Sequence, residues 1–209
     1  MSHKVGRGTV ANVLNRNGIE PAPDRGRRTR WSTFLKVWTG RGLVTHYLLF
    51  VISLADRVVQ VLGVTAKPNE AWILQIGRLI DSESGALCGK RYLIIDRDTK
   101  YTDQFRRLVR EAGTEVIRLP PMSPNLNAYA ERFVRSIKEE CLNRMIFIGQ
   151  ALLRRAVCEF MEHYHAERNH QGLGNRLVRG HATAVDLNGT VQRRRRLGGM
   201  LNFYYRKAA

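Results

Sequence analysis

The stretch YLIIDRDTKYT, residues 92–102, runs from four residues of high sheet propensity directly into charged residues. Residues 92–95 are typical of a buried strand, and Asp96 stands at its end. In sheets that contain parallel strands, ligands bind beyond the carboxyl ends of the central strands. We therefore expect Asp96 at a position where a carboxylate can take part in chemistry.

The segments around this strand predict alternating strands and helices. Upstream, β-branched and aromatic residues between turn signals predict three consecutive strands, over residues 34–39, 43–54 and 57–64. Asn69 is a suitable N-cap for the next helix, because isoleucines recur on one helical face after it: Ile73, Ile76 and Ile80. Downstream, helical spacing over residues 105–112 ends at Gly113, and residues 115–119 predict a further strand.

Two longer helices complete the predicted order, over residues 127–143 and 150–168. A three-strand meander followed by alternating helices and strands predicts an α/β fold, with a mixed sheet and helices on both of its faces. Residues 1–30 form a basic arm, and residues 176–209 form a basic C-terminal tail.

The composition points to a polyanionic partner. The chain has 35 Lys and Arg residues against 18 Asp and Glu residues, which gives a formal net charge of +17. Nucleic acid is the first expected partner, and an anionic membrane surface is the second. Three cysteines without CxxC spacing argue against a disulfide framework, and the apolar runs are too short to span a bilayer. We expect a cytoplasmic protein with no membrane partner.

A second carboxylate can join Asp96. Glu131 follows 35 positions later, in the first turns of a predicted helix, and the intervening helix and strand form a crossover unit. Such units return the chain to the same edge of a sheet, so the two carboxylates can converge. Carboxylate oxygens are the ligands that Mg²⁺ prefers, and two such ions assist phosphoryl transfer. The alternative is that Asp96 only forms a turn and Glu131 is only a solvated charge.

The helix that carries Glu131 also presents bases. Glu131, Arg135 and Lys138 share one face at spacing i, i+4 and i+7. The neighbouring face is apolar and predicts the buried stripe, formed by Ala130, Phe133, Val134, Ile137 and Cys141.

Three blocks of the sequence, in this order and spacing, resemble the catalytic core of insertion-sequence transposases and retroviral-type integrases: IIDRDTKYT, LPPMSPNLNAYAERFVRSIKEECL and YHAERNHQGLG. These are the DDE enzymes, and the resemblance covers about residues 31–175. It implies a ribonuclease H-like fold, DNA integration and recombination, and Mg²⁺ or Mn²⁺ as cofactor. The segment KVGRGTVANVLNRNGIEPAP resembles the end of the helix-turn-helix region and linker that precede such cores. Only one helix of that region is expected, so the chain starts inside it.

The resemblance assigns roles to residues. Asp96 matches the second acid of the catalytic and metal-binding triad, and Glu131 matches the third. The partners it implies are DNA, a second copy of the chain, or an intact transposase with which the chain co-assembles. Nine basic residues are expected to contact DNA: Arg97, Arg132, Arg135, Lys138, Arg168, Arg193, Arg194, Arg195 and Arg196.

The position that matches the first acid of the triad holds Trp31. Two carboxylates without the bridging ligand would hold metal weakly, so we expect little or no strand transfer. Four other acids offer no obvious substitute: Asp24, Asp56, Asp98 and Asp103. The alternatives are an inactive remnant that binds DNA or co-assembles with intact transposase, and a nuclease of the same fold with another arrangement of metal ligands.

Two further segments carry candidate residues. His163, His165 and His170 lie near the end of the last long helix, where packing or phosphate contact is favoured over metal binding. The run RRRR at 193–196 precedes the aromatic cluster at 203–205, and such a combination can hold DNA through phosphate contacts and stacking.

Overall fold

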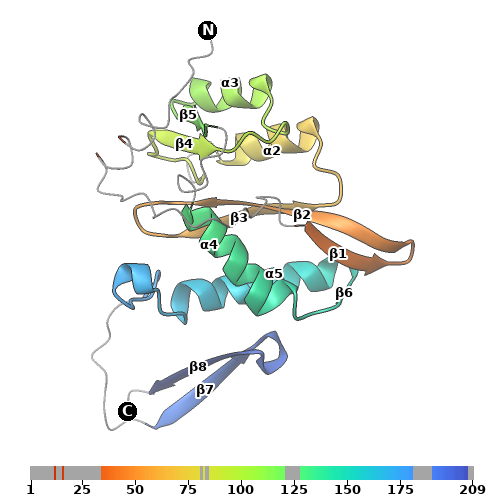
Figure 1. Cartoon of the computed structure of the whole chain (residues 1–209), viewed down its shortest axis with the longest axis vertical. Helices are drawn as coiled ribbons and strands as arrows, with labels where there is room; N and C mark the ends of the chain where they lie inside the picture. Colours follow the sequence, from red (N-terminus) through yellow and green to blue (C-terminus); the bar gives the residue numbers. More distant parts are fainter. Residues whose placement is uncertain are drawn as a thin grey trace. The chain divides into compact units, whose positions relative to one another are not determined.

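A computed structural model describes residues 34–80, 82, 85–120, 128–180 and 190–206, together with Asn12 and Arg16 (Figure 1). Asn12 and Arg16 are helical. The rest of the basic arm and Trp31 lie outside the described residues. The chain divides into two compact units: unit 1 is Met1–Leu35, Thr45–Ala55 and Gln60–Val134, and unit 2 is Lys36–Val44, Asp56–Val59 and Arg135–Ala209.

The three predicted strands of the meander are present. They are β1 (Phe34–Thr39), β2 (Gly42–Ile52) and β3 (Val59–Thr65), and a two-residue turn joins the first two. The Thr39 hydroxyl donates to the carbonyl of Gly42 at 2.9 Å across this turn. A short strand that was not predicted, β6 (Phe147–Ile148), pairs in parallel with β1 and puts Val37 opposite Phe147. The strand order is therefore β3-β2-β1-β6.

The opening stretch forms the predicted strand β4 (Tyr92–Ile95), which pairs in parallel with β5 (Glu115–Arg118). The register puts Tyr92 opposite Glu115 and Ile95 opposite Arg118. These two strands form a separate two-stranded sheet, whereas the sequence predicted one mixed sheet. The edge of β1 that lies away from β2 is taken by β6. The mixed α/β class is confirmed, with its parallel pairs divided between two sheets.

Two helices build the core of unit 1. They are α2 (Glu70–Ile80) and α3 (Asp103–Glu111). Helix α2 begins after Asn69, as predicted, and α3 begins after Thr102, whose side chain accepts from the N–H of Phe105. The Asn69 side chain accepts from the backbone N–H of Trp72 at 3.0 Å, and Gly113, with φ of 86°, follows the end of α3. Gly77 lets the helices approach, because an added Cβ would lie 3.2 Å from Leu108. The buried cluster comprises Ile73, Ile76, Ile80, Leu87, Ile95, Phe105, Val109 and Val116.

The predicted helix over 127–143 is two elements. An α-helix, α4 (Ala128–Ile137), continues as a π-helix over Lys138–Leu142. The N–H of Asn143 donates to the carbonyl of Lys138 at 2.9 Å, five residues earlier, which gives the wider turn. The predicted stripe is confirmed, since all of its members are buried: Ala130, Phe133, Val134, Ile137 and Cys141.

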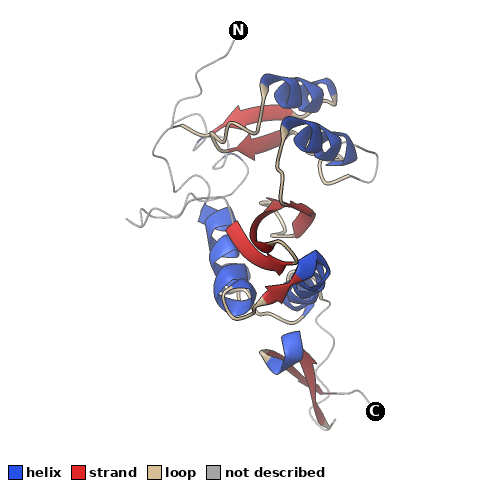
Figure 2. Ribbon diagram, turned by 90° about the vertical axis from the view of Figure 1, so that its right-hand side faces the viewer, coloured by secondary structure: helices blue, strands red, loops and turns tan. Residues whose placement is uncertain are grey.

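Unit 2 contains the second predicted long helix, α5 (Gly149–Ala166), whose apolar side includes the buried Leu153, Val157 and Phe160. The segment expected as a basic tail forms an antiparallel hairpin, which Figure 2 shows. Its strands are β7 (Val191–Arg196) and β8 (Leu201–Arg206). Within the described ranges, none of the helices has the length and apolar character that a membrane span requires.

Candidate active site and nucleic-acid interface

Asp96 follows β4 directly, as predicted, and is half-buried. Its Oδ1 accepts from the backbone N–H of Asp98 at 3.0 Å, so the carboxylate also closes a turn. Asp98 in turn receives the Lys100 ammonium at 2.7 Å. The Lys100 ammonium lies 5.5 Å from the centre of the Tyr47 ring. Asp96 thus forms a turn, as one interpretation of the sequence expected, and it also lies at the end of a strand, where the metal-binding interpretation expected it.

The surroundings of Asp96 disfavour its charged form. Burial raises its pKa most, and the neighbouring charge of Asp98 raises it further, against the lowering effects of the Asp98 N–H and of Lys100. Burial together with the charges of Asp96 and Asp98 also raises the pKa of Tyr101, which packs on Phe105 with ring centres 5.4 Å apart. A bound cation would relieve this cost on the carboxylate.

The other acids that the sequence offers in place of the missing ligand have partners of their own. Asp98 is ion-paired with Lys100, and Asp103, the first residue of α3, is ion-paired with Arg106. Asp56 accepts from the N–H of Val58 at 3.1 Å and closes a different turn. None of these contacts supplies a third ligand to Asp96.

Glu131 lies half-buried in the first turn of α4, in the same compact unit as Asp96. The convergence of the two carboxylates stays a prediction. In the part of the chain that the structure describes, no three histidine, cysteine or carboxylate side chains gather closely enough to hold a metal ion. Trp31, at the position of the expected first acid, lies outside that part.

The basic residues around α4 differ in exposure and in contacts. Arg132 and Arg135 are exposed, and Lys138 is half-exposed at the start of the π-helix. Arg97 donates to the carbonyl of Leu119 at 3.1 Å and so ties the end of β4 to the end of β5. Arg168 pairs with Glu140 at 2.8 Å. Their contact with DNA stays a prediction.

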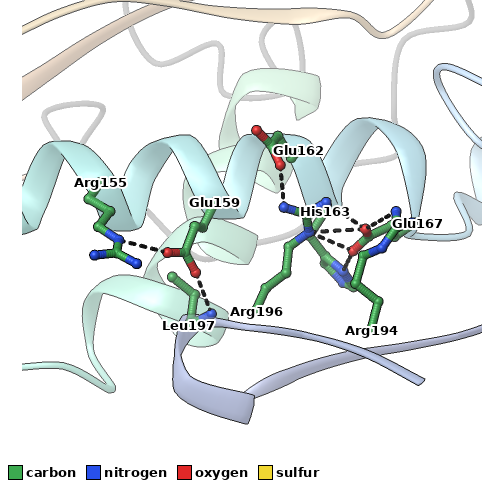
Figure 3. Close-up of polar contacts among 8 residues, drawn as sticks. All are labelled: Arg155, Glu159, Glu162, His163, Glu167, Arg194, Arg196 and Leu197. Carbon is green, nitrogen blue, oxygen red and sulfur yellow. Dashed lines mark hydrogen bonds and ion pairs between the residues drawn. The ribbon is translucent and has the colours of Figure 1, made fainter.

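Two of the four arginines at 193–196 form ion pairs with glutamates of the same chain. Arg194 and Arg196 both reach Glu167, at 3.2 Å and 2.7 Å, and Arg196 also pairs with Glu162 (Figure 3). The Glu167 side chain is only 1% exposed, and it also meets the Nδ1 of His163 at 3.1 Å. These contacts fasten the hairpin to the carboxyl end of α5.

The partners of Glu167 stabilise its charge. Burial raises its pKa, but hydrogen bonds from Arg196, His163 and Arg194 outweigh burial and lower the pKa from 4.5 to about 2. Glu159 lies on α5, about two turns before Glu167. It accepts from the N–H of Leu197 at 2.7 Å, and this bond lowers its pKa. These residues were not among the predicted site residues, although Glu159, His163 and Glu167 stand at helical spacing i, i+4 and i+8.

The three histidines of the YHAERNHQGLG segment pack against protein groups. His165 accepts from the buried N–H of Val59 at 3.1 Å, and His170 meets the carbonyl of Tyr164 at 2.7 Å. Burial, followed by the charge of Arg179, lowers the pKa of His165 to about 4, so its ring is neutral at neutral pH. With His163 on Glu167, this agrees with the packing interpretation that the sequence favoured.

Residues 112–177 match the family model described as the integrase core domain. This match confirms the resemblance to the catalytic core of integrases and transposases. The matched segment contains Glu131, both long helices and the three histidines, and it begins after Asp96.

Among curated proteins, 98 residues of the chain are 30% identical to the insertion element IS476 uncharacterized 39.2 kDa protein of Xanthomonas euvesicatoria. This alignment covers 46% of the chain and 28% of that relative, so the chain spans less than a third of the relative's length. Among solved structures, the chain is similar to one in the cryoEM structure of the simian T-cell lymphotropic virus intasome in complex with PP2A regulatory subunit B56 gamma. The TM-score is 0.47 and the identity 10%, over 90% of this chain and 72% of that one.

Proposed function

We propose that this protein binds DNA through an integrase or transposase core of the ribonuclease H-like, DDE type. One observation carries the proposal: Asp96 directly follows β4 as a half-buried carboxylate in the same unit as Glu131, which lies in the segment matched by the integrase core family. The net charge of +17 supports a polyanionic partner. In this proposal residues 1–30 are a basic arm, 31–175 the core and 176–209 a basic C-terminal segment.

The donor set fits a hard divalent cation in kind. Asp96 and Glu131 offer carboxylate oxygens, and the raised pKa of Asp96 supports a site at which a positive ion would stabilise the carboxylate. Mg²⁺ or Mn²⁺ would supply activation of an attacking hydroxyl and charge stabilisation at the phosphate. Two carboxylates make a weaker site than three, and Trp31 brings none. We therefore propose little or no strand transfer by this chain alone.

The second candidate is a non-catalytic protein that binds DNA and associates with its own copy or with an intact transposase. The contacts of Asp56, Asp98 and Asp103 favour it, because each of these acids already has a partner within its own segment. Both candidates share DNA binding and differ in catalysis.

The test combines metal binding with plasmid nicking. Mn²⁺ should raise the melting temperature of the wild type and not that of Asp96→Asn, because only the bound folded state gains free energy. Asp103→Asn, an exposed acid on α3, is the matched control and should respond like the wild type. Equal stabilisation of all three proteins by Mn²⁺ would contradict the assignment of Asp96.

Catalysis is tested by plasmid nicking with a variant that places an acid at position 31. Nicking by the wild type in Mg²⁺ or Mn²⁺ should be at background. Trp31→Asp should restore it, and Asp96→Asn in the same chain should abolish it again. Nicking that stays undetectable in a folded Trp31→Asp protein would refute the missing ligand as the cause. Absence of salt-dependent DNA binding by the wild type would refute the proposed function as a whole.

A further inference from the structure

The β7–β8 hairpin divides its arginines between two faces. In an antiparallel pair, residues directly opposite each other lie on the same face, and the face changes at each step along a strand. Arg193 lies opposite Tyr204 and Arg195 opposite Asn202, whereas Arg196 lies opposite Leu201. We call outer face the six residues Val191, Arg193, Arg195, Asn202, Tyr204 and Arg206, and inner face the six residues Gln192, Arg194, Arg196, Leu201, Phe203 and Tyr205.

The inner face attaches the hairpin to α5. Arg196 is only 17% exposed and binds Glu167, and Leu201 is 9% exposed. On the same face Arg194 lies over the Tyr205 ring at 5.1 Å, and Tyr205 stacks on Phe203 with ring centres 5.7 Å apart. The guanidinium groups of this face are therefore committed to contacts within the chain.

The outer face has the opposite character. Val191 and Tyr204 are each 61% exposed, and Arg193 and Arg195 are exposed as well. None of its six residues is acidic. The Nε of Arg193 donates to the Asn202 side chain at 2.8 Å, which orders the guanidinium while using one of its five N–H donors. An exposed tyrosine thus stands beside ordered positive charge on one face of a two-stranded sheet.

We propose that the outer face binds the sugar-phosphate backbone of DNA. Arg193 and Arg195 would each contact a different phosphate, because residues two apart along a strand are separated by roughly 6.7 Å. Tyr204 would pack on a sugar or a base between them. The proposal rests on the proposed function for the identity of the polyanion as DNA. It goes further in assigning the contact to two of the four arginines and in giving Arg194 and Arg196 a structural role.

The test measures binding of the full chain to a fluorescent DNA duplex by anisotropy at several salt concentrations. Arg193→Ala/Arg195→Ala should weaken binding roughly tenfold at low salt and reduce the slope of log K against log salt by about 1.8, or 0.9 for each lost phosphate contact. Tyr204→Ala should weaken binding with the slope unchanged. Arg107→Ala/Arg110→Ala removes the same charge from exposed positions of α3 and is the matched control, with a much smaller expected effect.

Two checks keep the result interpretable. The melting temperature of Arg193→Ala/Arg195→Ala should match that of the wild type, and Arg193→Gln/Arg195→Gln keeps more of the side chains if alanine lowers it. A second arm measures binding to vesicles that contain anionic lipid. The wild type and Arg193→Ala/Arg195→Ala should bind these vesicles equally well.

The outcomes separate this proposal from the proposed function. An unchanged salt slope in the Arg193/Arg195 variants, while the wild type binds DNA, overturns the outer face alone. An equal loss in the α3 control also overturns it, because net charge would then explain the effect. A loss confined to vesicles overturns it in favour of a membrane surface. Failure of the wild type to bind DNA at all overturns both proposals.

Discussion

Arg196→Ala removes the principal partner of a buried carboxylate. In the folded chain Glu167 receives the Nε and Nη2 of Arg196 at distances from 2.7 Å to 3.0 Å, with weaker help from Arg194 and His163. Because the Glu167 side chain is 1% exposed, removal of the guanidinium leaves a buried charge with fewer partners. The change therefore tests whether this pair fastens the hairpin to α5.

The expected loss of unfolding free energy is about 2–3 kcal/mol at pH 7. Breaking a buried ion pair costs about 3–5 kcal/mol, and the remaining contacts of Arg194 and His163 put this case at or below the lower end. The pKa of Glu167 gives an independent comparison. A fall from 4.5 to about 2 corresponds to roughly 3 kcal/mol, by which all partners together outweigh the cost of burial. For a chain of this size the melting temperature should fall by roughly 5–10 °C.

The pH dependence has a definite sign. A carboxylate whose pKa is lowered by folding stabilises the protein above its ordinary pKa of 4.5, and that stabilisation is lost as pH falls towards 2. The difference between wild type and Arg196→Ala should be full at pH 6–7 and should shrink below about pH 4.5. Urea unfolding at pH 7 and at pH 3.5 measures both values.

Arg193→Ala is the matched control, because it removes an exposed arginine from the same strand. Its expected effect is within about 0.5 kcal/mol. If Arg196→Ala were no more destabilising than Arg193→Ala, or if the difference did not change with pH, Glu167 would not be the anchor of the hairpin.

Three other variants test local arguments. Asp96→Asn should stabilise the metal-free protein at pH 7, because burial disfavours the carboxylate, and the gain should vanish below its ordinary pKa of 3.8, as urea unfolding at the two pH values would show. His165→Leu should cost about 1–3 kcal/mol at pH 8 by removing the acceptor of the Val59 N–H. That cost should shrink as pH falls below 6.5, because the wild type then loses the stability of its neutral ring. Asn69→Ala should cost about 1 kcal/mol by removing the acceptor of the Trp72 N–H, whereas Asn69→Asp should cost little.

Local signals predicted the elements that stand on local interactions. Helix α2 begins after Asn69, and α3 ends at Glu111, two residues before Gly113, since a cap and a glycine act within one turn of the chain. The buried side of α4 followed from apolar spacing alone. The π-helix after Ile137 did not, because the sequence keeps its apolar period while the hydrogen bonds change from four to five residues.

Contacts between segments far apart along the chain could not be predicted from the sequence. Strand β6 has two residues, too few to show a period, yet it takes the edge of β1. In the candidate site, the strand-end position of Asp96 was predictable from residues 92–95. The contacts of Arg194 and Arg196 were not, because their partner Glu167 lies 27 or more positions away and no local rule connects them.

The sequence of four consecutive arginines does not indicate which of them lie on the inner face of the hairpin, and only the structure shows this. Charge alone cannot choose which arginines turn inward, because a slip of one residue would offer Arg193 and Arg195 to Glu167 instead. The apolar residues of the hairpin make the choice. Such a slip would expose Leu201, which is 9% exposed, and would bury Asn202 in its place. The burial of Leu201 therefore favours the register that leaves Arg193 and Arg195 outside, and the proposed DNA contact of this hairpin depends on that register.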